Sequence, residues 1–139
     1  MGDRANVYVK DGEGGVYLYS HWGGTELPGT LQQAMKRKLR WDDRAYLARI
    51  IFCEMVAGQE RDETGFGISP DIPDGADRVL IVDCDKKTIS DVSMVDSSYN
   101  LLKEPKVFRV YTFEEFINHR RPQWAERCFP ALVEPFRVP

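Results

Sequence analysis

The chain has 139 residues, 42% of them hydrophobic and 12% aromatic, enough for one hydrophobic core and too few for two ordinary domains. Its formal net charge of -3 disfavours non-specific binding to nucleic acid. Three widely spaced cysteines without a C-x-x-C pair predict neither a disulfide framework nor a thiolate zinc site, and no apolar run approaches the ~20 residues of a membrane span, so we expect a cytoplasmic protein.

The first elements form a predicted β-hairpin. Residues 6–10 and 16–20 are short runs of β-branched and aromatic residues, and the glycine-rich stretch 11–15 lies between them as a flexible loop. The alternation places Tyr8 and two further tyrosines on one face of this hairpin, namely Tyr17 and Tyr19.

Two helices are predicted next. Thr30 followed by Gln33 matches a capping box, and apolar residues then recur at helical spacing, so we expect a helix from 28 or 31 to 39. Asp42 and Asp43 can cap a second helix, which carries a wide apolar face and ends before Gly58.

The second half of the chain is predicted to add strands and one short helix. Glycines, prolines and acidic residues over 58–78 predict a long ordered loop with a brief strand at 66–68. After it we expect a hairpin of strands 79–83 and 88–92, a strand over 107–111, a short helix capped by Thr112 and Glu115, and an extended tail from about 122 that contains Pro130, Pro135 and Pro139. This order predicts a single α+β domain over residues 1–139, with an antiparallel sheet packed against two main helices plus the short C-terminal helix.

The junction between the first hairpin and the first helix is the predicted ligand site. Glycines permit close approach to a ligand, a helix N-terminus presents N–H groups to an anion, and a tryptophan offers a stacking face. The alternative is a tight turn in which the glycines provide positive φ and the tryptophan packs as a lid on the core. The proposed ligand-binding residues are Ser20, His21, Trp22, Gly23, Gly24 and Thr25.

Basic residues on and after the first helix are predicted to neutralise a phosphate at this junction. They are Lys36, Arg37, Arg40 and Arg44, and the alternative is a solvated helix face. A second glycine-flanked segment, Thr64–Ser69, contributes Phe66 as another stacking face if it borders the same cleft. No P-loop and no G-x-G-x-x-G motif is present, so nucleotide hydrolysis and hydride transfer lack their usual signatures.

The residue patterns support catalysis and metal binding less strongly than ligand binding. His21 could act as general acid or base with Ser20, Cys53 or Glu54, but no recognised nucleophile spacing accompanies it, and a structural histidine is favoured. Glu54 is expected to point partly inward and to form a salt bridge with Arg44 or Arg49. Asp83, Asp85 and Asp91 suggest a magnesium or calcium site, but Asp83 and Asp85 lie where a hairpin must turn, which explains them more simply, so no metal and no cofactor is predicted.

Three segments of the chain resemble a family of small uncharacterised proteins of bacteriophages, prophages and their bacterial hosts with a Tyr-x-His-Trp-Gly-Gly signature. The segments are Tyr19–Gly24, Tyr46–Phe52 and Thr64–Ile68, and the resemblance covers most of residues 6–117. It implies no established reaction and no site residue. It implies a phage context, in which small accessory proteins block host defences, some by sequestering nucleotide immune signals in pockets shared between subunits.

We therefore expect a non-enzymatic, phage-type protein that binds a phosphate-bearing nucleotide, with an anti-defence role and possible assembly into a homo-oligomer. One alternative is an inhibitor that binds a host protein through exposed tyrosines and the acidic loop at 60–77. The other is a small hydrolase or transferase that uses His21.

Overall fold

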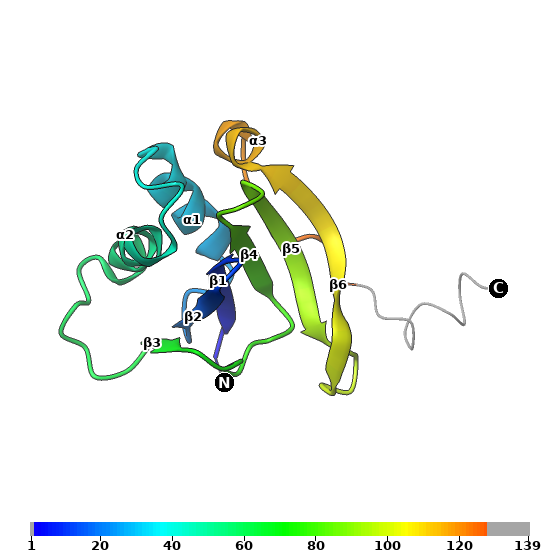
Figure 1. The fold of residues 1–139 in the computed structure, drawn as a ribbon. Helices are drawn as coiled ribbons and strands as arrows, with labels where there is room; N and C mark the ends of the chain where they lie inside the picture. The colour runs from blue at the N-terminus through cyan, green and yellow to red at the C-terminus, as the bar shows by residue number, and fades with distance from the viewer. Residues whose placement is uncertain (1, 128–139) are drawn as a thin grey trace.

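The computed structural model describes residues 2–127, which form one six-stranded sheet with three helices on one of its faces (Figure 1). The strands are β1 (Ala5–Asp11), β2 (Gly14–Ser20), β3 (Phe66–Ser69), β4 (Val79–Asp83), β5 (Thr88–Val95) and β6 (Leu101–Thr112). The helices are α1 (Leu27–Lys36), α2 (Arg44–Val56) and α3 (Phe113–Asn118). The predicted α+β domain with a short C-terminal helix is confirmed.

The sheet has the order β3-β2-β1-β4-β5-β6. Four of its pairings are antiparallel, but β1 and β4 pair in parallel, with Val7 opposite Leu80 and Val9 opposite Val82. The helices α1 and α2 lie in the connection that returns the chain to the centre of the sheet, as parallel neighbours require. The predicted antiparallel sheet is therefore confirmed as mostly antiparallel, with this one parallel pair in addition.

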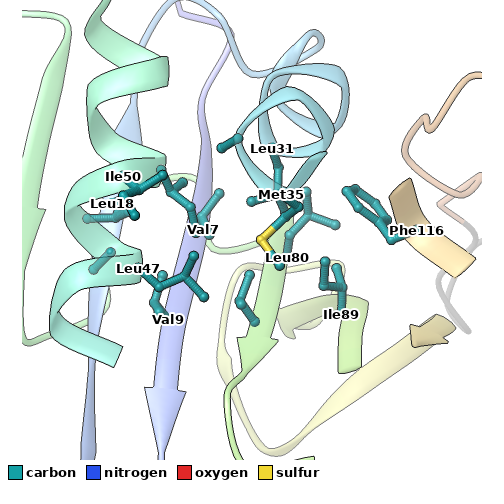
Figure 2. Close-up of a cluster of buried hydrophobic side chains, with 14 of the residues drawn as sticks. Val7, Val9, Leu18, Leu31, Met35, Leu47, Ile50, Leu80, Ile89 and Phe116 are labelled. Carbon is teal, nitrogen blue, oxygen red and sulfur yellow. The ribbon is translucent and has the colours of Figure 1, made fainter. Parts of the chain in front are cut away.

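Alternation along the central strands builds the main core. Val7 and Val9 of β1 point to the helical face together with Leu18, Leu80 and Ile89 from neighbouring strands. Against them pack side chains from all three helices, including Leu31, Met35, Leu47, Ile50 and Phe116 (Figure 2). The helices are therefore fixed over β2, β1, β4 and β5 by a continuous apolar layer.

The other face of the sheet carries a smaller cluster. Tyr8 and Tyr17 are neighbours across β1 and β2, and their rings stack with centroids 4.2 Å apart. Tyr17 is buried there together with Val79, Val92 and Ala76, the last of which comes from the loop before β4. The predicted aromatic face exists, and the 70–78 loop covers part of it.

The first hairpin has a tighter turn than predicted. β1 runs to Asp11 and β2 begins at Gly14, so only two residues lie between the strands. The Asp11 carboxylate accepts the backbone N–H groups of Glu13 and Gly14 at 2.8 and 3.2 Å. This side chain fixes the turn locally, in place of the flexible five-residue loop that the glycines suggested.

Helix α1 begins earlier than its predicted cap. Glu26 is the N-cap, Pro28 occupies the first turn, and Thr30 lies inside the helix, where its hydroxyl donates to the Glu26 carbonyl at 3.2 Å. The helix ends at Lys36, because Lys38 and Arg40 have positive φ. The prediction of Thr30 as the cap is therefore wrong.

Strand β6 also begins six residues before the predicted start, at Leu101 instead of 107. This longer strand contains Pro105, which is tolerated because β6 is an edge strand, and two register shifts interrupt its pairing with β5. The capping box of Thr112 and Glu115 is confirmed, with bonds of 3.0 and 2.8 Å. Of the predicted tail, the described residues up to 127 have no regular structure, and its prolines at 130, 135 and 139 lie outside the described residues.

Candidate functional site

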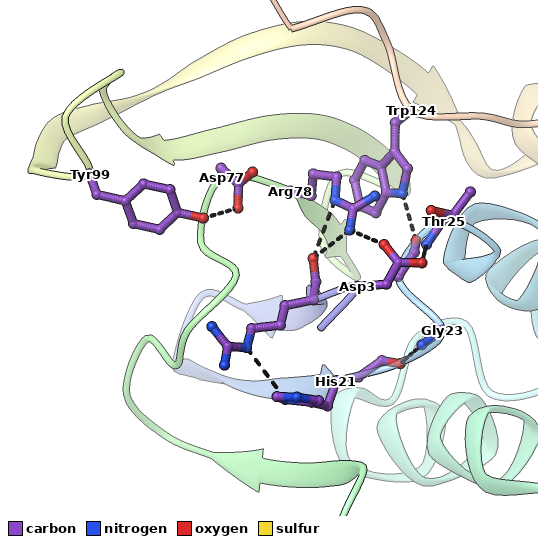
Figure 3. A network of polar contacts seen from close by, with 11 residues as sticks. Asp3, His21, Gly23, Thr25, Asp77, Arg78, Tyr99 and Trp124 are labelled. Carbon is purple, nitrogen blue, oxygen red and sulfur yellow. Dashed lines mark hydrogen bonds and ion pairs between the residues drawn. The ribbon is translucent and has the colours of Figure 1, made fainter. Parts of the chain in front are cut away.

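The junction between β2 and α1 is held by the N-terminal segment of the chain (Figure 3). The backbone N–H of Gly23 donates to the Ser20 hydroxyl at 3.1 Å, and that of Gly24 to the Asp3 carbonyl at 2.7 Å. The N–H of Thr25 donates to the Asp3 carboxylate at 2.8 Å. The N–H groups of Gly23 and Gly24, which were predicted to receive an anion, are therefore already used inside the fold, and so is the N–H of Thr25.

Asp3 is the centre of this network. Its carboxylate pairs with Arg78, which also donates to the Arg4 carbonyl at 2.8 Å. Burial raises the pKa of Asp3, but hydrogen bonds from Arg78 and Thr25 outweigh it and hold that pKa below its usual value of 3.8. The acid thus occupies the position at which a bound anion was expected.

Gly24 is required by packing, and not by positive φ. A Cβ at Gly24 would lie 2.4 Å from the Asp3 carbonyl oxygen and 3.0 Å from the Arg4 carbonyl carbon, both backbone atoms. Neither Gly23 nor Gly24 is among the residues with positive φ. Gly24 is thus needed for the turn, as the alternative interpretation held. The reason is that other backbone atoms lie close to it, and not that its own backbone is left-handed.

His21 joins three segments of the chain. Its carbonyl accepts from Asp3 N at 2.7 Å and its N–H donates to Gly65 O at 2.8 Å. Its Nδ1 lies 2.7 Å from the Tyr19 hydroxyl and 3.4 Å from Arg4 Nε. Because the arginine can only donate, Nδ1 accepts, which places the ring proton on Nε2.

The catalytic partners considered for His21 are engaged elsewhere. The buried Ser20 hydroxyl accepts from Gly23, and the Cys53 thiol lies 3.7 Å from Arg49 on α2. Glu54 is half-buried, as predicted, but Arg44 pairs with Asp11 at 3.3 Å, so the predicted salt bridges to Glu54 do not form among the described residues. Burial raises the pKa of the remaining described thiol, Cys84, to about 11, which makes it a poor nucleophile.

Trp22 lies exposed between two hollows, with 62% of its surface accessible, and is not a lid on the core. One hollow, of about 290 Å³, is lined by Ser20, Trp22, Gly23 and Phe66, together with Glu26 of the α1 cap. The other, of about 400 Å³, lies between Trp22 and the 64–66 segment. The two hollows together form one cleft, which we call the Trp22 cleft. The glycine-flanked segments 20–25 and 64–69 both border it, because β3 pairs with β2 beside the junction.

The predicted basic residues are not part of this cleft. Helix α1 carries the chain away from the junction, and its ten residues span about 15 Å. Lys36 and Arg37 lie at its far end, Arg44 pairs with Asp11 at the turn of the first hairpin, and Arg40 packs over the Tyr46 ring at 4.6 Å. The structure thus brings together the predicted aromatic and glycine residues and separates the four predicted cations from them.

A larger hollow, of about 610 Å³, was not predicted. It lies on the other side of the α1 N-terminus and is lined by Thr25, Glu26, Arg120, Arg121 and Trp124, among others. The Trp124 indole donates to the Gly24 carbonyl at 2.7 Å, which ties the 119–127 segment to the junction (Figure 3). An Arg-Arg-Pro run near a tryptophan was visible in the sequence, but nothing in its spacing links it to residues 100 positions earlier.

Acidic side chains near the β4–β5 turn serve the backbone. Asp83 accepts the N–H groups of Asp85 and Lys86 at 3.0 Å each, as the turn interpretation predicted. Within residues 2–127, no group of three or more His, Cys, Asp or Glu side chains is placed to hold a metal ion. None of the helices in the described part of the chain is long and apolar enough to cross a membrane.

Comparison with known proteins returns no match to a family model, a curated protein or a solved structure.

Proposed function

We propose that this protein is a non-enzymatic, phage-type binding protein that holds a phosphate-bearing nucleotide, with the base of the nucleotide in the hollow between Trp22 and Phe66. The observation that carries the proposal is the Trp22 ring, which is exposed and lines this hollow. Stacking of a base on an aromatic ring contributes about 1–3 kcal/mol and tolerates different bases.

Polar groups around the ring support the same class of ligand. Ser20, Thr30 and Gln59 line the hollow together with the Gly23 backbone. Such polar groups beside apolar side chains, here Leu27 and Phe66, are the usual composition of a small-molecule site. The resemblance to phage proteins adds the biological role, sequestration of a host nucleotide signal, and assembly into a homo-oligomer stays a prediction.

A binding role is favoured over catalysis by the state of His21. Its Nδ1 accepts from Arg4 and lies beside Tyr19, and no carboxylate or thiol of the described residues is paired with it. General acid–base catalysis requires such a group within hydrogen-bond reach of the reacting proton. The alternative of an inhibitor that binds a host protein has no comparable geometric support, since Tyr17 of the tyrosine face is buried.

Calorimetric titration tests the proposal. The ligands are the four ribonucleoside 5′-diphosphates, cyclic di- and trinucleotides and cyclic ADP-ribose isomers. We expect at least one to bind, and we expect Trp22→Ala to weaken that binding about tenfold or more. Tyr46→Ala removes another half-exposed aromatic ring, remote from the cleft, and is the matched control. Absence of binding, or equal loss in both variants, would overturn the proposal.

A further inference from the structure

The hollow beside Arg120 and Arg121 is separated from the Trp22 hollow by the first turn of α1. Thr25, Gly29 and the two arginines line the larger hollow, whereas Gly23, Leu27 and Thr30 line the smaller one. Glu26, the N-cap of α1, lines both. A ligand that extends from one hollow to the other must therefore pass the Glu26 carboxylate.

The two arginines are available for an anion. Both side chains are exposed, and neither pairs with an acidic side chain within residues 2–127. This distinguishes them from Arg44, Arg78 and Arg127, each of which forms an ion pair. Guanidinium groups match the geometry of phosphate oxygens and remain charged at any physiological pH.

The backbone that carries the arginines is held at both ends. Before them, the buried Gln32 side chain donates to the carbonyls of Phe116 at 3.1 Å and His119 at 2.5 Å. After them, Trp124 donates to the Gly24 carbonyl, and Arg78 lies 5.7 Å over the Trp124 ring. Because this backbone is fixed, only the side chains of Arg120 and Arg121 must be ordered when an anion binds, which lowers the entropic cost of binding.

The order of these features follows the order of parts in a nucleotide. An aromatic hollow, a carboxylate and an arginine pair succeed one another around the α1 N-terminus, as base, sugar and phosphate succeed one another in the ligand. A carboxylate repels phosphate, but it accepts hydrogen bonds from the hydroxyls of a ribose, as it does in dinucleotide-binding folds. The position of Glu26 between the two hollows suits that role.

We propose that Arg120 and Arg121 bind the phosphate groups of the nucleotide and that Glu26 accepts hydrogen bonds from its ribose hydroxyls. This inference rests on the proposed function. It replaces Lys36, Arg37, Arg40 and Arg44 as the phosphate-binding residues, and it assigns recognition of the sugar to a residue that the sequence did not indicate.

Calorimetry with the four ribonucleoside 5′-diphosphates and their parent nucleosides tests the arginine pair. We expect Arg120→Ala with Arg121→Ala to weaken diphosphate binding tenfold or more, and to leave nucleoside binding unchanged. The double variant of Arg37 and Arg40, which removes two other exposed arginines at the far end of α1, is the control and should change affinity about twofold at most.

Gly29 offers a second test that spares every charge. A Cβ at Gly29 meets no atom within 4 Å, and the residue lines the arginine hollow. Gly29→Met should therefore place a bulky side chain in the hollow without steric conflict in the fold and weaken diphosphate binding, whereas Gly29→Ala should leave binding unchanged. Thermal unfolding of both variants identifies any loss of folding.

Glu26→Gln tests recognition of the sugar. We expect the ratio of affinities for ribo- and 2′-deoxyribonucleoside diphosphates to fall toward one, while affinity for inorganic pyrophosphate rises because a negative charge is removed. If neither the diphosphates nor the cyclic nucleotides bind, or Trp22→Ala has no effect, the proposed function and this inference both fail. If binding depends on Trp22 but the two double arginine variants behave alike, or the sugar preference survives Glu26→Gln, this inference alone is overturned.

Discussion

Asp3 shows how one side chain can take the place of an expected ligand. Its carboxylate accepts a hydrogen bond from the Thr25 N–H and pairs with Arg78. The N–H groups before α1 therefore stabilise the fold and are not free to bind an anion. The predicted β1–β2 hairpin brings Asp3 beside Thr25, but Asp3 lies before the predicted strand at 6–10, so no role was predicted for it. For the neighbouring Trp22 the sequence left two alternatives, a stacking face and a lid on the core, and its 62% exposure rules out the lid.

Asp3 should make stability depend on pH. Its pKa is below the usual value in the folded protein, so the stabilisation is present above about pH 4 and is lost as the pH falls through the folded-state pKa. Urea denaturation at pH 7 and pH 3 should show a larger loss in the wild type than in Asp3→Asn. Asp71→Asn, at an exposed loop position, should behave as the wild type. Equal losses in wild type and Asp3→Asn would contradict this role.

Substitution of Gly24 by alanine should destabilise the protein more than the same substitution of its neighbour Gly23. At Gly24 a Cβ would meet two backbone carbonyl atoms, whereas at Gly23 it would meet only the Ser20 hydroxyl, at 3.3 Å. We expect Gly24→Ala to lower the free energy of unfolding by about 1–3 kcal/mol and Gly23→Ala by less. Chemical denaturation measures the free energy of unfolding of both variants. A larger loss for Gly23→Ala would show that the neighbouring backbone does not confine Gly24 as described.

At the level of elements, two similar capping patterns had different outcomes. Thr112 and Glu115 form the predicted box, whereas Thr30 lies within α1, which Glu26 and Pro28 begin one turn earlier. The difference arises because the contact of Leu27 with the core extends the helix beyond its local signal. Most strands were predictable from alternation, but the start of β6 and the parallel pairing of β1 with β4 depend on distant partners that no local pattern records.

The two threonines should therefore respond differently to alanine. Thr112→Ala removes a cap and is expected to lower the free energy of unfolding by about 0.5–2 kcal/mol. Thr30→Ala removes only a hydroxyl bonded within the helix and should be close to neutral, since alanine has the higher helix propensity. Thermal unfolding of the two variants provides the comparison, and a larger loss for Thr30→Ala would refute the assignment of the caps.

At the scale of the whole molecule, the 119–127 segment joins parts of the fold that are far apart in sequence. Trp124 bonds to the junction before α1, and Arg127 lies 2.8 Å from the buried Asp91 carboxylate, as an ion pair without hydrogen-bond alignment. The second Asp91 oxygen accepts the Ala125 N–H at 2.7 Å. The segment thus forms one wall of the arginine hollow and depends on Asp91 for its position, which sequence periodicity could not indicate.

Arg127→Ala should be strongly destabilising. Asp91 is 1% exposed, so removal of its partner leaves a buried charge uncompensated, at a cost of about 3–5 kcal/mol. Combining Asp91→Asn with Arg127→Ala removes the uncompensated charge and should restore part of the loss. A double-mutant cycle by urea denaturation gives the coupling, and additive effects would show that the ion pair does not hold the segment.

Native mass spectrometry tests the central claim, that the cleft at Trp22 holds a nucleotide. Wild type and Trp22→Ala are purified in parallel from bacterial cells, incubated with a nucleotide extract of those cells and transferred without denaturation, after which any retained molecule is released and identified. The proposed function predicts a phosphate-containing nucleotide on the wild type that the variant lacks, and the same spectrum reports the oligomeric state. An empty wild type, or equal retention by both proteins, would contradict the account.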